Sequence, residues 1–201
     1  MNTIIYFSRP DFVDDKDESM RKSNEEAAQT REAIVAAAAD HLRRTGIAEA
    51  SLVDMMSAAG LTHGGFYRHF RNKEHLVAEG LSAAGVKTIA TISRNMAKGG
   101  INAAVDSYLS RTHRDASVPT CPFAALGSEV ARSGEETRAA AAAVLEKLFT
   151  TLADGDVGAD ARADAIVLLS TLIGAMTLAR IAGKTALSEE ILTCAKKHLH
   201  R

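Results

Sequence analysis

The stretch GLTHGGFYRHFRNKE at residues 60–74 decides the fold of this protein more than any other part of the chain. It contains a turn residue, Gly60, then a polar helix start at Thr62, and then aromatic residues interleaved with basic ones. Phe66 and Phe70 lie one helical turn apart, so both can face the interior on one side of a short helix. The other side chains then face outward, where basic and aromatic donors suit a phosphate backbone and base edges. The stretch therefore predicts a small helix that contacts nucleic acid.

Two further helices are predicted upstream. From Glu25 onward, apolar residues recur every three or four positions, and Gly46 follows where that helix would end. Ser51 begins a second, short helix, with its hydroxyl as the N-cap and Asp54 three residues later as a capping carboxylate. Two helices joined by a tight glycine turn and braced by a preceding helix form a helix-turn-helix. The sequence predicts such a domain over residues 20–72.

The remainder of the chain, residues 73–201, is predicted to be helical throughout. Alanine is abundant and the chain has 3 prolines, a composition that favours helix. The breaks fall at glycine and proline positions, so the expected helices span residues 73–97, 100–113, 122–132, 135–153, 160–182 and 188–200. The predicted fold class is all-α, with about nine helices divided between the N-terminal helix-turn-helix domain and a larger C-terminal helical domain.

Charge and cysteine content narrow the function classes. A net charge of -1 and a pI near 6.7 exclude a surface coated with positive charge, so nucleic acid would be bound through a local patch. Cys121 and Cys194 lie far apart and suit a reducing cytoplasm better than a disulfide framework. The apolar stretch at residues 165–179 is bounded by Asp164 and Arg180 and is too short to span a bilayer, so no membrane partner is expected.

The first 19 residues differ from the rest of the chain. They are acidic, contain Pro10 and show no sustained helical period, so we expect residues 1–19 to form a disordered extension. Met20 is followed by the basic residues Arg21 and Lys22. Our hypothesis is that Met20 is the native start and that residues 1–19 are an upstream extension.

Residues 30–76 resemble the DNA-binding domain of the TetR family of transcriptional regulators. The likeness rests on the helix TREAIVAAAADHLRRTG, the short helix SLVDMMSAAGL, and the motif THGGFYRHF followed by RNKEHL. A weaker likeness, carried by CPFAALGSEVAR, connects the C-terminal half with the family's divergent effector and dimerisation domain. The resemblance implies a cytoplasmic, ligand-responsive regulator of transcription, a repressor that a small molecule releases from its operator.

The resemblance also implies roles for matching positions. Tyr67, His69 and Lys73 correspond to phosphate contacts, and both Tyr and His can donate to phosphate oxygens. Gly64 and Gly65 have no side chains, so the backbone there can approach the wall of the DNA groove closely. The expected DNA-binding residues are Ser51, Thr62, His63, Gly64, Gly65, Tyr67, Arg68, His69 and Lys73. The histidines at 63, 69 and 75 are six residues apart and do not share a helical face, so no metal site is expected.

A homodimer on a palindromic DNA operator is expected, because one short recognition helix contacts too few bases for useful specificity. The helices at 160–182 and 188–200 are the expected interface, as a four-helix bundle that Gly174 and Ala175 allow to pack closely. Helices between residues 73 and 182 would enclose a mostly apolar pocket for the small-molecule effector. The candidate pocket residues are Met96, Tyr108, Phe123, Phe149 and Met176.

Two alternatives stay open. The first is a helical ligand-binding or protein-interaction module that does not bind DNA. The second is a redox sensor or nucleophile based on Cys121, which precedes Pro122 at a helix N-terminus where a thiolate is favoured and which His113 could assist; the competing interpretation is a small buried apolar residue. The sequence contains no phosphate-binding glycine loop, HExxH or GxSxG motif, so no enzyme activity and no cofactor are expected.

Overall fold

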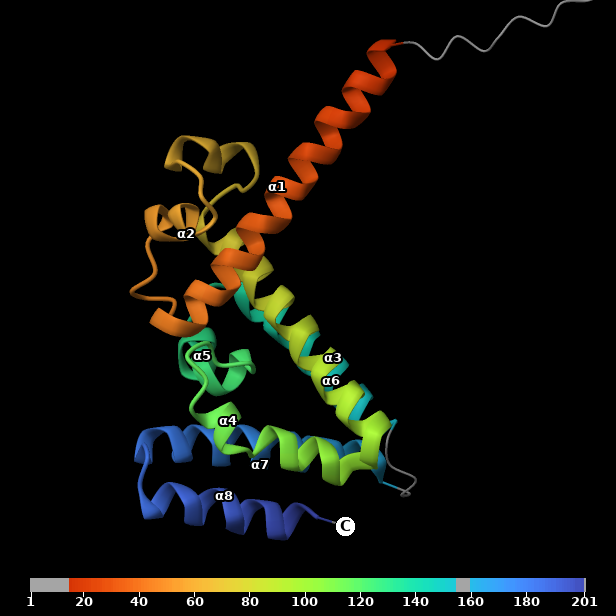
Figure 1. Ribbon diagram of the computed structural model, residues 1–201, viewed down its shortest axis with the longest axis vertical. Coiled ribbons are helices and arrows are strands. Elements are labelled where there is room, and N and C mark those ends of the chain that lie inside the picture. The colour runs from red at the N-terminus through yellow and green to blue at the C-terminus, as the bar shows by residue number, and fades with distance from the viewer. Residues whose placement is uncertain (1–14, 155–159, 201) are drawn as a thin grey trace, which may run out of the picture.

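The computed structural model describes residues 15–154 and 160–200, which fold into helices joined by turns (Figure 1). The predicted all-α class is confirmed for these residues. In chain order the elements are α1 (Asp15–Thr45), α2 (Leu52–Ala58), the 3-10 helix η1 (His63–Arg68), α3 (Lys73–Tyr108), α4 (Arg111–Arg114), α5 (Pro122–Ala131), α6 (Glu135–Ala153), α7 (Ala161–Ala182) and α8 (Ala186–Leu199).

The first helix begins earlier than the sequence pattern indicated. α1 starts at Asp15, so residues 15–19, which were expected to belong to a disordered extension, are helical. Acidic residues are favoured in the first turn of a helix, and no proline follows to stop it, although the segment lacks an apolar stripe. The expectation for residues 1–14 falls outside the described residues. At the other end, Gly46 has a φ of 91° and donates to the Leu42 carbonyl at 2.8 Å, which confirms the predicted C-terminal glycine.

The turn after α2 is set by a cap at one end and a glycine at the other. The Ser51 hydroxyl accepts from the Asp54 backbone N–H at 3.1 Å and donates to the Asp54 carboxylate at 2.6 Å, so the predicted cap is confirmed. After the helix, Gly60 takes a φ of 73°, a conformation that glycine adopts without strain. The Leu61 N–H then donates to the Met56 carbonyl at 3.0 Å, which reverses the chain toward η1.

α3 is one long helix with a bend. Asn72 caps its start, with the side-chain oxygen accepting from the His75 backbone N–H at 2.8 Å. Gly99 and Gly100 have non-helical dihedral angles, and Gly100 has a φ of 67°. The predicted break at these glycines is therefore a bend, after which α3 changes direction and runs to Tyr108 beside α7 (Figure 1). The short α4 that follows was expected to be part of the preceding helix.

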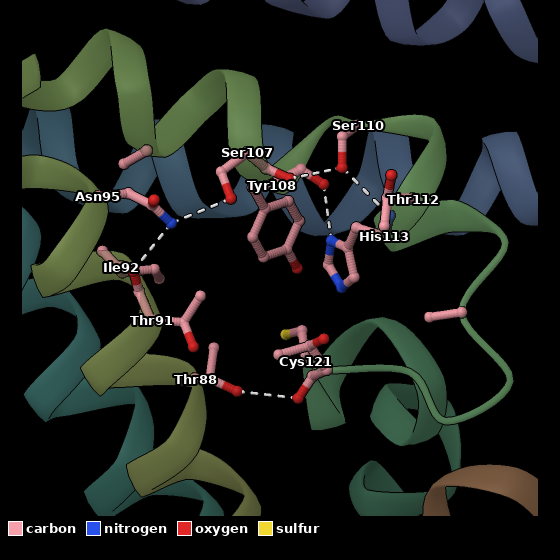
Figure 2. Close-up of a pocket in the computed structure, with 13 residues that line it drawn as sticks. Thr88, Thr91, Ile92, Asn95, Ser107, Tyr108, Ser110, Thr112, His113 and Cys121 are labelled. Carbon is pink, nitrogen blue, oxygen red and sulfur yellow. Dashed lines mark hydrogen bonds between the residues drawn. The ribbon is translucent and has the colours of Figure 1, made fainter. Parts of the chain in front are cut away.

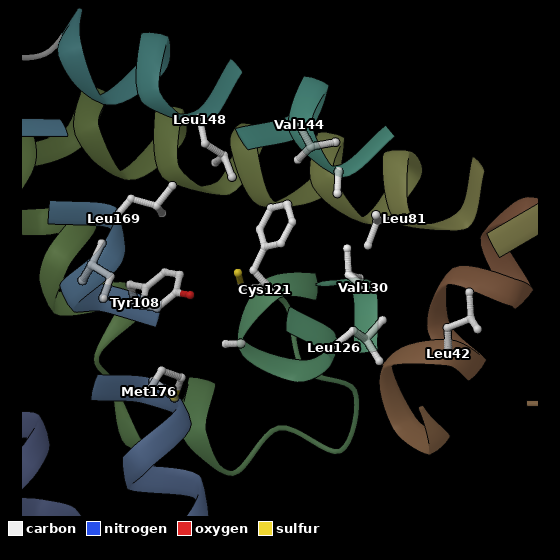
Figure 3. Packing of buried hydrophobic residues seen from close by; sticks show 14 of the residues in the cluster. Leu42, Leu81, Tyr108, Cys121, Leu126, Val130, Val144, Leu148, Leu169 and Met176 are labelled. Carbon is white, nitrogen blue, oxygen red and sulfur yellow. The ribbon is translucent and has the colours of Figure 1, made fainter. Parts of the chain in front are cut away.

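The hydrophobic core lies where the helices of the C-terminal half meet α1 and α3. α5 sits at its centre, and its residues Leu126 and Val130 pack among α3, α6 and Leu42 of α1 (Figure 3). α3 and α6 approach closely at Gly85, where an added Cβ would lie 2.4 Å from a methyl carbon of Val144. This tight contact means that a shift of either helix must displace the other.

α7 spans Ala161–Ala182, as predicted for residues 160–182, but it is longer than the apolar stretch at residues 165–179 on which the membrane estimate was based. It has 22 residues and is long and apolar enough, by length and composition alone, to cross a membrane. The limits at Asp164 and Arg180 used for the membrane estimate were too narrow, because the helix includes both charged residues. In this structure, α7 packs against α6 and α8. Its exposed large apolar residues are Ile166, Val167, Leu178 and Ile181.

Candidate nucleic-acid interface and ligand cavity

The segment expected to be a short recognition helix is a 3-10 helix, η1. Its N-cap residue, Thr62, has an extended backbone, but the side chain makes no capping hydrogen bond. Gly64 and Gly65 lie in the first turn. Glycine has no side chain to make contacts and does not restrict the backbone, so it specifies an α-helix only weakly. A short 3-10 helix is a common outcome for such a weakly specified helix start.

Two phenylalanines anchor η1 to the rest of the domain. Phe66 is fully buried and Phe70 is 2 % exposed, and their rings stack with centroids 5.6 Å apart. The guanidinium of Arg31 on α1 lies 4.9 Å from the centre of the Phe70 ring and also pairs with Glu79 of α3. The prediction that both phenylalanines are core residues is confirmed.

The polar side chains of η1 face away from this anchor. Tyr67 is 68 % exposed, and its ring meets the Phe66 ring edge-on at 5.1 Å. A groove separates η1 from α1, and several of the predicted DNA-binding residues lie together along it. Its lining residues are Glu26, Ala27, Thr30, Leu61, Thr62, Gly65, Arg68 and His69.

The lining does not include four other predicted DNA-binding residues, Ser51, Gly64, Tyr67 and Lys73. The Ser51 hydroxyl serves as the cap of α2, and the Lys73 ammonium donates to the Ile47 carbonyl at 3.1 Å. Gly64 is exposed within η1. His63 begins η1, but its side chain lies outside the described part of the chain.

A carboxylate on α5 holds the loop between α1 and α2. Oε2 of Glu129 accepts hydrogen bonds from the backbone N–H groups of Ile47 at 2.7 Å and Ala48 at 2.9 Å. A side chain at Gly46 would place its Cβ 2.9 Å from the same carboxylate. Sequence reasoning missed Glu129, because a single glutamate on a helix has no pattern that distinguishes it from a solvated charge.

Two more contacts connect the helix-turn-helix with α6. Arg71, which follows η1, pairs with Glu136 of α6 at 2.6 Å. The carboxylate of Glu74 on α3 accepts from the backbone N–H of Thr137 at 3.4 Å, near the start of α6. Because the α6 N-cap itself provides no side-chain hydrogen bond, a residue of α3 takes that role.

A cavity of about 230 Å³ lies in the bend of α3 (Figure 2). The two arms of α3 form two of its walls, and α4 and the segment leading into α5 form the others. Its lining residues, none of which carries a charge at neutral pH, are Thr88, Thr91, Ile92, Asn95, Ala104, Ser107, Tyr108, Ser110, Thr112, His113, Ala116, Thr120 and Cys121.

Of the predicted pocket residues, only Tyr108 lines this cavity. Met176 is fully buried and Phe123 is 7 % exposed, and both belong to the hydrophobic core. Met96 and Phe149 are partly buried and pack against the same core. The sequence favoured large apolar residues, but these fill the space between helices, whereas small hydroxyl-bearing residues leave the cavity open.

Three buried polar groups face one another at the inner end of the cavity (Figure 2). Nδ1 of His113 lies 2.6 Å from the backbone carbonyl of Tyr108, and the two rings meet edge-on with centroids 4.6 Å apart. Burial lowers the pKa of His113 below its ordinary value. Burial also raises the pKa of the Tyr108 hydroxyl well above its usual range. Both side chains are therefore uncharged at neutral pH.

The third group is the thiol of Cys121. The residue stands directly before α5, with Pro122 as the first residue of the helix, as the sequence predicted. The side chain is fully buried, and this burial raises the pKa of the thiol. A reactive cysteine needs the opposite environment, one that stabilises the thiolate. The structure therefore favours the interpretation of Cys121 as a small buried residue over a redox sensor.

Comparison with known proteins connects this arrangement with a family. The sequence model of "Bacterial regulatory proteins, tetR family" matches residues 34–80. The HTH-type transcriptional regulator TtgR of Pseudomonas putida is 41% identical over 58 residues, which are 29% of this chain and only 28% of that relative's length. An HTH-type transcriptional regulator of Mycobacterium tuberculosis is 30% identical over 165 residues, covering 75% of this chain and 84% of the relative.

The solved structures support the same fold over most of the chain. A TetR transcriptional regulator from Chloroflexus aurantiacus is 25% identical and superposes with a TM-score of 0.71, covering 87% of this chain and 96% of that structure. The similarity therefore extends through the C-terminal helices as well as the helix-turn-helix.

Proposed function

Because this chain belongs to the TetR family of DNA-binding transcriptional regulators, we propose that it is a repressor that a small molecule releases from a palindromic operator. The observation that carries this proposal is the construction of η1. Buried Phe66 and Phe70 hold it on α1, while Tyr67 and its polar neighbours face outward. An element anchored on one side and polar on the other suits a major groove, which is about 12 Å wide.

In this proposal the DNA contacts divide into two kinds. Tyr67 and His69 donate to phosphate oxygens and fix the position of η1 on the duplex. Thr62, His63 and Gly65, at the start of η1, lie next to the base edges, where Gly65 allows a close approach.

Release would follow from the connection between the cavity and the DNA-binding domain. Cys121 at the start of α5 lines the cavity, and Glu129 on the same helix grips the loop between α1 and α2. α3 likewise begins at the helix-turn-helix and bends around the cavity. In a dimer, these helices set the spacing of the two DNA-binding domains. A ligand that binds more tightly to the conformation with a spacing unsuited to the operator shifts the population away from the DNA-bound state.

Exposed apolar residues support a homodimer through α7 and α8. Ile181 is 78% exposed and Leu187 is 58% exposed. Large apolar side chains exposed together on a surface are typical of a protein–protein interface. Gly174 on α7 has open space where a side chain would be, so a second helix could approach closely there. These features suit a four-helix bundle formed by α7 and α8 of two copies.

The dimer interface can be tested by placing a charge in it. Ile181→Glu should convert the dimer into a monomer in sedimentation velocity experiments, because a buried unpaired carboxylate is strongly unfavourable. Val86→Glu is the matched control, since Val86 is 59% exposed on α3 and outside the proposed interface. A dimer that persists in Ile181→Glu, or dissociates in Val86→Glu, would contradict this assignment.

The DNA-binding function itself is tested by a mobility-shift assay with the DNA upstream of the protein's own gene. We expect a retarded complex that survives competition by unrelated DNA. Genome-wide mapping of bound sites then provides the operator and its neighbouring genes. Absence of binding to all genomic sites would favour the rival class, a helical ligand-binding or interaction module without DNA binding.

A further inference from the structure

We propose that the cavity in the bend of α3 binds an uncharged small molecule that presents a hydrogen-bond donor and an acceptor side by side, as a primary amide does. The donor of the ligand meets Nε2 of His113, and its acceptor meets the hydroxyl of Tyr108. This inference rests on the proposed function, since it specifies the chemistry of the molecule that releases the operator.

The hydrogen-bonding role of His113 follows from its contact with the backbone. A carbonyl oxygen can only accept, so Nδ1, at 2.6 Å from the Tyr108 carbonyl, carries the hydrogen. In a neutral imidazole the other nitrogen, Nε2, is then an acceptor. Nε2 is buried and has no hydrogen-bond partner in the described residues, and the whole side chain is 9% exposed. It therefore presents an unused acceptor to the cavity.

Tyr108 supplies the complementary group. Its hydroxyl is buried, the residue is 6% exposed, and the hydroxyl has no nitrogen or oxygen partner among the described residues. The Cys121 thiol beside it is only a weak hydrogen-bonding group. Because burial raises the pKa of this hydroxyl, it keeps its proton and can donate. Burying a polar group without a strong partner is unfavourable, so binding of a molecule that satisfies both groups is favoured.

The surroundings select against charged molecules. No residue that lines the cavity is an acid or a base at neutral pH apart from His113, which burial keeps neutral. A ligand cation would also be repelled by the positive charge of partly buried Arg180, which acts on Tyr108, His113 and Cys121. Two nitrogens of the Arg180 guanidinium donate to backbone carbonyls, among them the His113 carbonyl at 2.8 Å, and the third, Nη1, is buried without a partner in the described residues. Arg180 does not line the cavity, so an anion there makes no direct contact with it.

Size gives a further limit. A cavity of about 230 Å³ is smaller than the roughly 300–1,000 Å³ of pockets that hold drug-sized ligands. Ile92 and Ala104 provide apolar wall between the hydroxyl-bearing residues. A compact molecule with one apolar face and one amide-like end suits this space better than a long acyl chain or a large polycyclic compound.

A matched set of probes tests the proposal on the full-length protein. Benzamide is neutral and carries the donor and acceptor together, benzoate is the corresponding anion, benzylamine is the cation, and toluene has neither polar group. Isothermal titration calorimetry should detect binding of benzamide and show at least tenfold weaker binding of the other three. Equal binding of benzoate or benzylamine, or no binding of benzamide up to its solubility limit, would overturn the proposal.

Two variants test the named contacts. Tyr108→Phe keeps the ring and removes a hydroxyl whose neighbour is only the weakly hydrogen-bonding Cys121 thiol, so it should leave the free protein about equally stable while weakening benzamide binding about tenfold. His113→Asn keeps a donor for the Tyr108 carbonyl and removes the acceptor at Nε2, so it should weaken binding similarly. Unchanged benzamide affinity in folded Tyr108→Phe and His113→Asn would overturn the assignment of these contacts.

A separate readout distinguishes the site from the function. Saturating benzamide is added to the protein–operator complex, and release is followed by fluorescence anisotropy. Benzamide that binds through Tyr108 and His113 without releasing DNA would support the site and contradict ligand-induced release. DNA binding with no benzamide binding would overturn the site and leave the regulator intact.

Discussion

The outer face of η1 and the cavity in the bend of α3 both gather polar side chains, but under opposite conditions. On η1, Tyr67 stands in water, and its neighbours lie along an open groove. In the cavity, Tyr108 and His113 are buried and have polar atoms without partners. Exposed donors suit a large, strongly anionic partner held by many weak contacts, whereas buried unpaired groups suit a small neutral partner held by a few specific ones.

Salt concentration should produce the largest difference between the two regions, because it affects operator binding at η1 and not ligand binding in the cavity. Operator binding releases counterions, so raising the salt from about 50 mM to about 200 mM should weaken it by roughly 10³–10⁵-fold if 6–10 phosphates are contacted. Binding of benzamide in the cavity should change little over the same range, because neither partner is charged. Anisotropy and calorimetry measure the two affinities in the same buffers. A flat salt response of operator binding would contradict the assignment of η1 to a phosphate backbone.

The structural link between the two regions can be weakened by substituting Glu129. Glu129→Ala leaves the N–H groups of Ile47 and Ala48 without their acceptor, so it should lower the free energy of unfolding by about 1–3 kcal/mol. It should also reduce the effect of a cavity ligand on operator affinity. Glu129→Gln, the matched control, keeps an oxygen acceptor and should lose less on both measurements. Urea unfolding that is identical in Glu129→Ala and the unaltered protein would contradict this link.

Acid should lower the stability of the folded protein through His113 in the cavity, and this effect should be smaller than that of Glu129→Ala. Burial lowers the pKa of His113 in the folded protein below its ordinary value of 6.5, so the unfolded chain takes up a proton first as the pH falls. The stability that neutral His113 contributes is complete above about pH 6.5 and is lost as the pH falls from there toward the folded pKa.

Thermal unfolding from about pH 7.5 to about pH 5.5 measures this contribution. The unaltered protein should lose more stability than His113→Asn, in which the other titrating groups are still present. An equal loss of stability in the two proteins would show that His113 does not behave as a buried neutral imidazole.

The helix-turn-helix could be predicted from the sequence because local signals specify it. Ser51 as a cap, Gly60 in the turn and the buried pair Phe66 and Phe70 each depend on neighbours within a few residues, and the structure contains them all. The 3-10 character of η1 was missed, because the glycines at 64 and 65 weaken a helix start without indicating what replaces it.

The cavity could not be predicted in the same way. Thr88, Tyr108 and Cys121 come together only because α3 bends at Gly99 and Gly100, and the sequence indicated a break there without its direction. Glu129 likewise gains its role from a loop distant in the sequence. Large apolar residues were the natural candidates for a pocket, but a core filled to normal density leaves no room beside them.

The most direct test of the DNA-binding account is the operator affinity of a Tyr67→Phe and His69→Ala double variant. Both changes remove donors that the account assigns to phosphate oxygens and leave Phe66 and Phe70 in place, so the free energy of unfolding should change by less than about 0.5 kcal/mol. Hydrogen bonds to charged groups contribute about 1.5–3 kcal/mol each, so the loss of two should lower the affinity for the operator by roughly 10²–10⁴-fold. An unchanged operator affinity in a stably folded double variant would contradict the account.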